Sequence, residues 1–220
     1  DVSKYKEISY AIPENKCINS PVVVGFGPAG MFASLLLARA GAKPIVLERG
    51  KAVEDRQADI NKFFETGVLN TESNVQFGEG GAGTFSDGKL TTNTKDFRHS
   101  FILKTFVEFG APEEILYEAK AHIGTDYLIK VVKNIREEVI RLGGTVLFDS
   151  KMTEVISENG TLTGVKYISN GAEKEIKTNS LILAIGHSAR DTFYALKEQN
   201  IKMEQKPFAM GVRIEHKQDF

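Results

Sequence analysis

The chain has 220 residues, of which 41% are hydrophobic and 26% charged, and its formal net charge is −1. This is the balance of an ordinary globular protein, without the concentrated basic surface that favours nucleic acid or an anionic membrane. No apolar run reaches the roughly 18 residues of a membrane-spanning helix, and the single cysteine, Cys17, excludes an internal disulfide. We therefore expect a reducing, cytoplasmic location.

The first predicted elements form one β-α-β unit. Residues 21–25 are a β-branched run ended by glycine, which indicates a buried parallel strand. A helix over 28–40 follows, with Pro28 in its first turn, where a missing N–H costs nothing, and Gly41 after its end. Residues 45–48 are the second strand.

The middle of the chain predicts helices over 53–66, 97–109 and 126–142, the last capped by Thr125. Short strands follow at 145–148, 151–157, 161–168, 173–177 and 180–185, with hairpin signals at Asn159-Gly160 and Asn170-Gly171. Residues 207–214 read as one strand of a different sheet. We thus expect a lead-in segment (1–20), one domain (21–200) with an antiparallel meander at about 145–178, and the start of a truncated substrate domain (201–220).

The segment Gly25-Phe26-Gly27-Pro28-Ala29-Gly30 matches G-x-G-x-x-G. In this motif the first glycine permits the tight turn, the second lets a pyrophosphate approach the backbone, and the third lets helix and strand pack closely. The free N–H groups of the helix N-terminus favour an anion there. Glu48 ends the second strand, close to the position of an acid that binds the adenosine ribose.

Both FAD and NAD use this fingerprint, but an antiparallel meander in place of a crossover helix is typical of flavoproteins with two dinucleotide-binding domains. Four segments, at 23–30, 75–90, 121–126 and 184–191, together resemble the FAD-utilising dehydrogenases of bacteria. The resemblance implies an α/β, Rossmann-like FAD-binding fold with a parallel central sheet plus the meander. It also implies an FAD-dependent oxidoreductase, without indicating its substrate.

The resemblance implies a set of cofactor-binding residues. It assigns the pyrophosphate to Gly25, Gly27, Pro28, Ala29 and Gly30, and the adenosine ribose to Glu48 with Arg49 beside it. It places the ribityl chain and the isoalloxazine against a second glycine-rich loop, with Gly81, Ala82, Gly83 and Thr84. The adenine side is assigned to Met152, Ala184 and Gly186.

Hydride transfer needs no protein nucleophile, so the sequence does not assign catalytic residues. His187, His122 and Lys89 are the candidates for a proton donor or a cation near the ring. No spacing typical of a metal site is present. We expect a small-molecule substrate, with NAD(P)H as the candidate reductant, and neither nucleic acid nor membrane as partner. The alternatives are an NAD(P)-dependent dehydrogenase and a non-catalytic flavin-binding module. The chain lacks an initial Met and the C-terminal glycine-acid motif of such flavoproteins, so we expect a fragment that binds FAD weakly or not at all.

Overall fold

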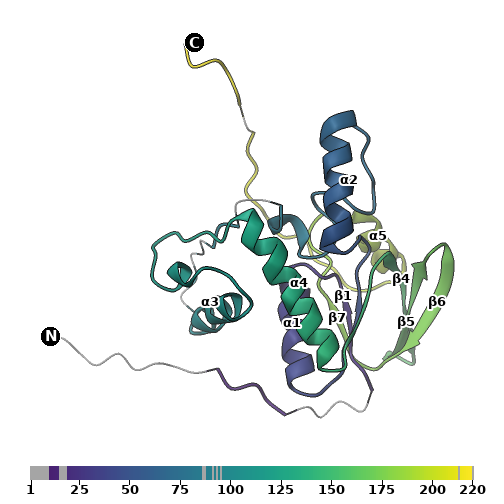
Figure 1. The fold of residues 1–220 in the computed structure, drawn as a ribbon. Helices are drawn as coiled ribbons and strands as arrows, with labels where there is room; N and C mark the ends of the chain where they lie inside the picture. The colour runs from purple at the N-terminus through teal and green to yellow at the C-terminus, as the bar shows by residue number, and fades with distance from the viewer. Residues whose placement is uncertain are drawn as a thin grey trace.

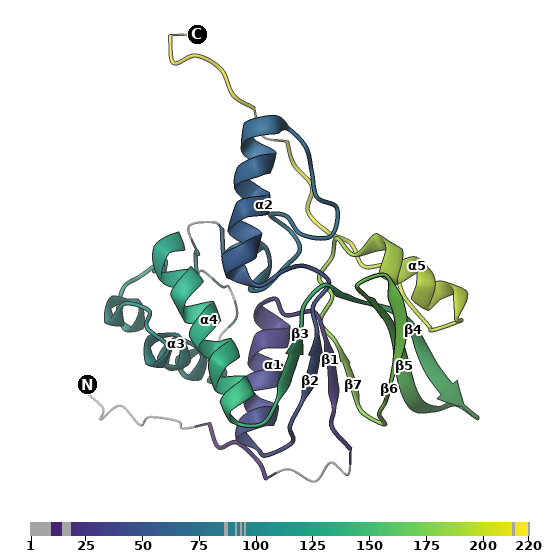
Figure 2. The same ribbon diagram turned by 45° about the vertical axis from the view of Figure 1, so that its right-hand side comes forward.

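The computed structural model describes residues 10–14, 19–85, 88–90, 92, 94, 96–212 and 214–219. Cys17 and part of the expected lead-in segment lie outside them. The described chain folds into three layers (Figures 1 and 2): helices cover one face of a parallel sheet, and a small antiparallel sheet covers the other. The prediction of a mixed α/β fold with two kinds of sheet is confirmed.

The parallel sheet consists of β1 (Val22–Val24), β2 (Ile45–Leu47), β3 (Thr145–Leu147) and β7 (Leu181–Leu183), in the order β3-β2-β1-β7. Its central strands are apolar on both faces because both faces are covered. Val23 and Val46 face the helices, whereas Val22, Val24 and Leu47 face the antiparallel sheet. This parallel order, with α1 crossing from β1 to β2, is a Rossmann-like arrangement.

The helical layer is formed by α1 (Pro28–Arg39) and α4 (Thr125–Arg141), with α3 (Arg98–Glu108) outside them. Apolar residues of α4 recur at helical spacing and are buried against α1 and the sheet: Leu128, Val131, Val132, Ile135 and Val139. The predicted cap was wrong. Thr125 is the first helical residue, and Gly124 precedes it as an N-cap that has no side chain to donate or accept.

The other layer is a meander of β4 (Ser150–Glu158), β5 (Thr161–Ser169) and β6 (Ala172–Lys177). Both hairpins turn through Asn-Gly pairs with positive φ, at Asn159-Gly160 (51° and 78°) and Asn170-Gly171 (52° and 76°). Two successive positive φ angles are the type I′ geometry that matches the twist of paired strands, so both hairpin predictions are confirmed. Met152, Val165 and Tyr167 pack this sheet onto β1 and β2.

At the upper end of the parallel sheet in Figure 2 lie α2 (Val53–Thr66), a short 3-10 turn (Gly81–Gly83) and α5 (Arg190–Glu198). A second 3-10 turn (Glu113–Leu116) packs beside α3. No helix among the described residues is long and apolar enough to cross a membrane.

The strand predicted at 207–214 is wrong, because the described residues of this segment form no strand. Phe208, Met210, Val212 and Ile214 alternate as in a strand, but each is more than 80% exposed. A strand requires a neighbouring strand to pair its N–H and C=O groups, and the described chain offers none at this place (Figure 1). The division at residue 200 stays a prediction.

The close packing of the β1–α1 turn gives the first testable expectation. A Cβ on Gly30 would clash severely with the Gly25 carbonyl oxygen, which is backbone and cannot move away cheaply. We expect Gly30→Ala to lower the free energy of unfolding by about 3 kcal/mol, measured by urea denaturation. Gly27→Ala, in the same turn, is the control that should leave it nearly unchanged; equal losses in both variants would contradict this packing.

Candidate functional site

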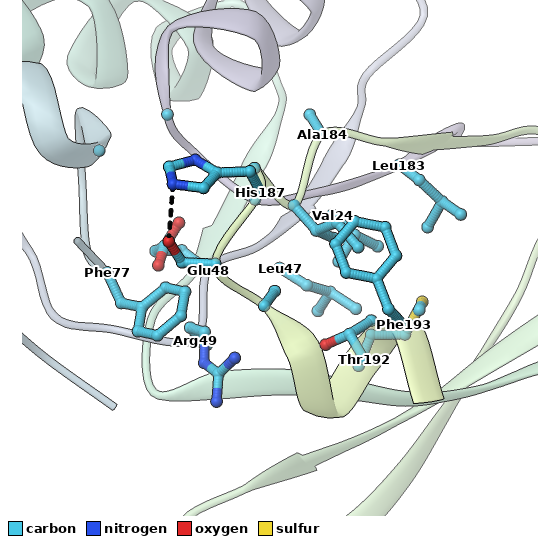
Figure 3. Close-up of a pocket in the computed structure, with 18 of the residues that line it drawn as sticks. Val24, Leu47, Glu48, Arg49, Phe77, Leu183, Ala184, His187, Thr192 and Phe193 are labelled. Atoms are coloured by element: carbon cyan, nitrogen blue, oxygen red, sulfur yellow. Dashed lines mark hydrogen bonds between the residues drawn. The ribbon is translucent and has the colours of Figure 1, made fainter. Parts of the chain in front are cut away.

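A cavity of about 600 Å³ opens at the carboxyl ends of β1, β2 and β7. In open α/β sheets this edge is where ligands bind. Figure 3 shows the side chains that line it, with Glu48 and Arg49 from the end of β2 on one side and Thr192 and Phe193 from α5 on the other.

The first glycine motif forms the floor of this cavity. Gly25 adopts a φ of +94°, and its N–H donates to the Leu47 carbonyl at 2.8 Å, so the chain turns sharply from β1 into α1. The first turn of α1 closes when the Met31 N–H donates to the Gly27 carbonyl. The N–H groups that precede this bond belong to the positive end of the helix, which suits an anion.

Gly27 differs from its neighbours in what surrounds it. A Cβ on Gly27 would meet only the Gly81 Cα, at an ordinary contact distance of 3.8 Å, and its φ of −75° suits any residue. The packing of the described chain therefore does not require glycine here. Gly27 lines the cavity, so its missing side chain leaves room for a ligand close to the backbone.

Glu48 is 4% exposed, and its carboxylate accepts backbone N–H groups from three segments. Oε1 accepts from Gly50 (2.9 Å) and from Gly78 in the second glycine-rich loop (3.1 Å), whereas Oε2 accepts from Phe26 in the first (2.7 Å). A carboxylate has about four acceptor positions. One position thus remains on Oε2, enough for one ligand hydroxyl.

Arg49 connects the end of β2 to α5. Its guanidinium donates to Asp191 (2.8 and 2.9 Å) and Glu72 (2.8 and 2.9 Å), and lies 4.2 Å from the centre of the Phe77 ring. The hydrogen bonds from Arg49 hold the pKa of Asp191 at about 2, so this carboxyl is ionised at neutral pH. Lys151, from β4, lies 3.3 Å from Glu72 and joins the same cluster.

The second glycine-rich loop packs directly on the first. The Gly80 N–H donates to the Phe26 carbonyl at 2.8 Å, and a Cβ on Gly81 would lie 3.2 Å from the Gly27 Cα. The buried Arg56 holds the loop from behind, because its guanidinium donates to the carbonyls of Asn74, Val75 and Glu79. Burial lowers the pKa of Arg56 to about 10, so it remains a cation at neutral pH. Ser86 and Asp87 of this loop lie outside the described residues.

A second cavity of about 400 Å³ lies on the other side of this contact and shares Pro28 and Ala29 with the first. Its walls are mostly apolar and come from α1, α3 and α4: Met31, Phe32, Ile102, Phe106, Leu128 and Val132. Gly83, Thr84 and Lys89 bring the second glycine-rich loop to its edge.

Most residues predicted to bind the cofactor lie together. The first cavity is lined by Gly25, Gly27, Pro28, Ala29, Glu48, Arg49, Gly81, Ala82, Met152, Ala184 and Gly186. Gly30 lies beneath the turn, and Gly83 and Thr84 line the second cavity. Their roles as ligand-binding residues stay predictions.

The three residues predicted as a proton donor or a cation near the ring lie in different places. His187 lines the first cavity and hydrogen-bonds the Ser188 hydroxyl at 3.2 Å, whereas Lys89 lines the second. His122 is exposed, pairs with Lys89 through a backbone bridge, and lines neither cavity. No group of three or more histidines, cysteines or acids able to hold a metal occurs in the part of the chain that the structure describes.

Sequence reasoning missed the wall of the first cavity that α5 and the following residues supply, including Thr192, Phe193, Leu196 and Met203. The sequence does predict a helix that opens at Arg190 and Asp191, and α5 begins there, but the sequence does not show which cavity the buried face of this helix closes.

Three comparisons place the chain among known proteins. No family model matches it. An uncharacterized protein of Clostridium beijerinckii is 58% identical over 199 residues, which are 90% of this chain and 37% of that protein. This chain thus spans little more than a third of that relative. The crystal structure of THI4 from Thermovibrio ammonificans superposes with a TM-score of 0.55 at 16% identity, over 84% of this chain and 64% of that one, which supports the fold.

The arrangement around Glu48 predicts a strong effect of Glu48→Gln. An amide would turn its NH₂ group toward at least one backbone N–H that now donates to the carboxylate, which leaves buried donors unpaired. We expect the free energy of unfolding to fall by about 3 kcal/mol, measured by urea denaturation. Glu72→Gln, in a partner of Arg49 that is far more exposed than Glu48, should cost less than about 1 kcal/mol. An equal cost of the two would contradict the role given to Glu48.

Proposed function

We propose that this chain is the dinucleotide-binding part of an FAD-dependent oxidoreductase. The observation that carries the proposal is the open space at Gly27, at the positive end of α1 and at the edge of the sheet where ligands bind. A diphosphate fits this place because it needs both backbone N–H donors and a backbone without a side chain.

The other residues fit the ADP half of such a cofactor. Glu48 Oε2 has one acceptor position for a ribose hydroxyl. Ala184 and Gly186 continue from β7 along the cavity, and Met152 and Phe193 supply apolar surface for a flat base. The adenine would thus lie on the meander side.

The second, apolar cavity fits the other half. It shares Pro28 and Ala29 with the first cavity, so a dinucleotide with its diphosphate at Gly27 would lie beside it. Its apolar walls suit a flat ring system, and Thr84 and Lys89 bring a hydroxyl and a cation to its edge. When bound, the flavin would supply the hydride chemistry; the protein would bind, orient and shield it.

FAD is favoured over NAD(P) by the connection between β3 and β7. This connection is an antiparallel meander packed on the sheet, where a plain NAD-binding domain continues with strands and crossover helices. The substrate, the electron donor (NAD(P)H in our expectation), and the activity of the longer protein to which such a domain belongs are further proposals.

The first test is binding. We expect the chain to bind ADP and FAD, measured by calorimetry and by the visible absorbance and fluorescence quenching of the flavin. Binding of NADH alone would favour an NAD(P)-dependent dehydrogenase. Bound FAD that neither NADH nor NADPH reduces, in the chain or in the longer relative, would favour a non-catalytic flavin-binding module.

The variant that tests the site is Gly27→Ala. A methyl group would occupy the space beside the helix N-terminus, so we expect the affinity for ADP and FAD to fall at least about tenfold, or about 1.4 kcal/mol. The free energy of unfolding should change by less than about 0.5 kcal/mol. Gly211→Ala, at an exposed position with open space, is the matched control. Unchanged affinity in Gly27→Ala would reject the diphosphate site.

A further inference from the structure

The second glycine-rich loop is anchored from inside by Glu79, whose carboxyl is completely buried. Oε2 accepts the Val53 N–H at the start of α2 (2.7 Å) and the Arg136 guanidinium from α4 (2.8 Å). The backbone of Glu79 is held as well, since its N–H donates to Lys51 and its carbonyl accepts from Arg56. The position of this residue is therefore fixed by several elements at once.

The anchor acts on the wall of the first cavity. The next residue, Gly80, donates its N–H to the Phe26 carbonyl in the first glycine motif, and Gly81 lies so near Gly27 and Pro28 that a Cβ on it would press against both. If Glu79 leaves its place, Gly80 and Gly81 lose their contact with the turn that would hold the diphosphate.

The charge on Glu79 is poorly compensated. Oε1 is buried and receives no hydrogen bond from the described residues. Arg136 also binds Glu54 (2.7 Å), which Lys133 contacts too, so the nearest cation is shared. Of the other charged groups that face Glu79, Glu48 repels its negative charge and Arg56 attracts it. Burial raises the pKa of Glu79 to about 7, against the lowering effect of the Val53 N–H and Arg136.

We propose that Glu79 is a positioning residue that closes the second glycine-rich loop over the dinucleotide site and takes up a proton when the anionic diphosphate binds. The second part of this proposal rests on the proposed function. A diphosphate at Gly27 adds negative charge next to this loop, and a like charge favours the neutral carboxyl. Protonated Glu79 keeps its contacts without an uncompensated charge in the interior.

Two pH dependences follow. In the absence of ligand, opening of the loop returns Glu79 to water and its pKa to the ordinary value of 4.5. Because the closed loop has the higher pKa, its stability is complete below about pH 4.5, falls as the pH rises to about 7, and then levels off. For binding, the diphosphate raises the pKa above 7, so the affinity is complete below about pH 7 and falls above it.

The first arm of the experiment needs no ligand. Amide hydrogen exchange of the segment that contains Gly80 is measured from about pH 5 to 7 and divided by the intrinsic rate. In the wild type we expect this ratio to rise with pH, by up to about tenfold per unit. In Glu79→Gln it should be flat. Glu54→Gln is the matched control: Glu54 binds the same Arg136, and the hydrogen bond from Arg136 holds its pKa at about 2, so a slope should persist, with its upper end moved to lower pH because Arg136 is no longer shared.

The second arm measures the affinity for FAD by calorimetry from about pH 6 to 9, because both phosphates of FAD are diesters and, unlike the terminal phosphate of ADP, do not titrate in this range. We expect a loss of about tenfold in the wild type and in Glu54→Gln, which corresponds to a pKa raised by about one unit in the complex. Glu79→Gln should bind with an affinity independent of pH. If Glu79→Gln does not fold, Arg136→Gln replaces it; loss of the cation should move both profiles to higher pH.

The outcomes separate the two proposals. If the wild type binds neither ADP nor FAD at any pH, the proposed function and the proton uptake on binding both fail, whereas the exchange arm still decides whether Glu79 controls loop closure. A flat exchange profile in the wild type, or a wild-type slope that persists in Glu79→Gln, overturns the role of Glu79. Normal binding with a pH-independent affinity overturns the proton uptake alone.

Discussion

The way the two glycine-rich segments meet depends on one buried carboxylate, which hydrogen-bonds backbone that lies outside helices and strands. Glu48 receives N–H groups from the first glycine motif, from its own strand end and from the second glycine-rich loop. Backbone in these segments cannot use helix or sheet hydrogen bonds, and unpaired buried N–H groups are costly. A carboxylate offers enough acceptor positions to satisfy all three, so this single side chain determines how the two glycine-rich segments meet.

The glycines of the first motif are present for two different physical reasons. Gly25 and Gly30 are imposed by the fold, since a Cβ at either would collide with backbone of Ala184 or Gly25. Gly27 is not, because the chain leaves ordinary space around it. A residue that the protein does not need for its own packing indicates a need from outside the protein. Under the proposed function, that need is the close approach of a ligand to the N-terminus of α1.

Sequence reasoning succeeded where structure is local. The β1–α1–β2 unit and both Asn-Gly hairpins are determined by backbone conformations that a few neighbouring residues specify. It failed where distant partners decide. The alternation at 207–214 satisfies the pattern of a strand but not its need for a neighbour, and the wall formed by α5 depends on Arg49 and Asp191, 142 positions apart. The spacing of Glu48 suggested a ribose ligand but could not show the N–H groups that already occupy most of its acceptor positions.

Buried charge in this protein gathers around the second glycine-rich loop. Arg56, Glu79 and Glu48 are each almost completely buried there. A loop of glycines has few side chains to bury, so apolar packing cannot fix it, and hydrogen bonds from ions to its backbone must do so. A loop that is held by hydrogen bonds from ions differs in one respect from a loop that is held by apolar packing. Ionic contacts respond to protons and to a nearby anion, and this loop packs on the turn proposed to hold the diphosphate, which is why the proposal gives it a response to charge.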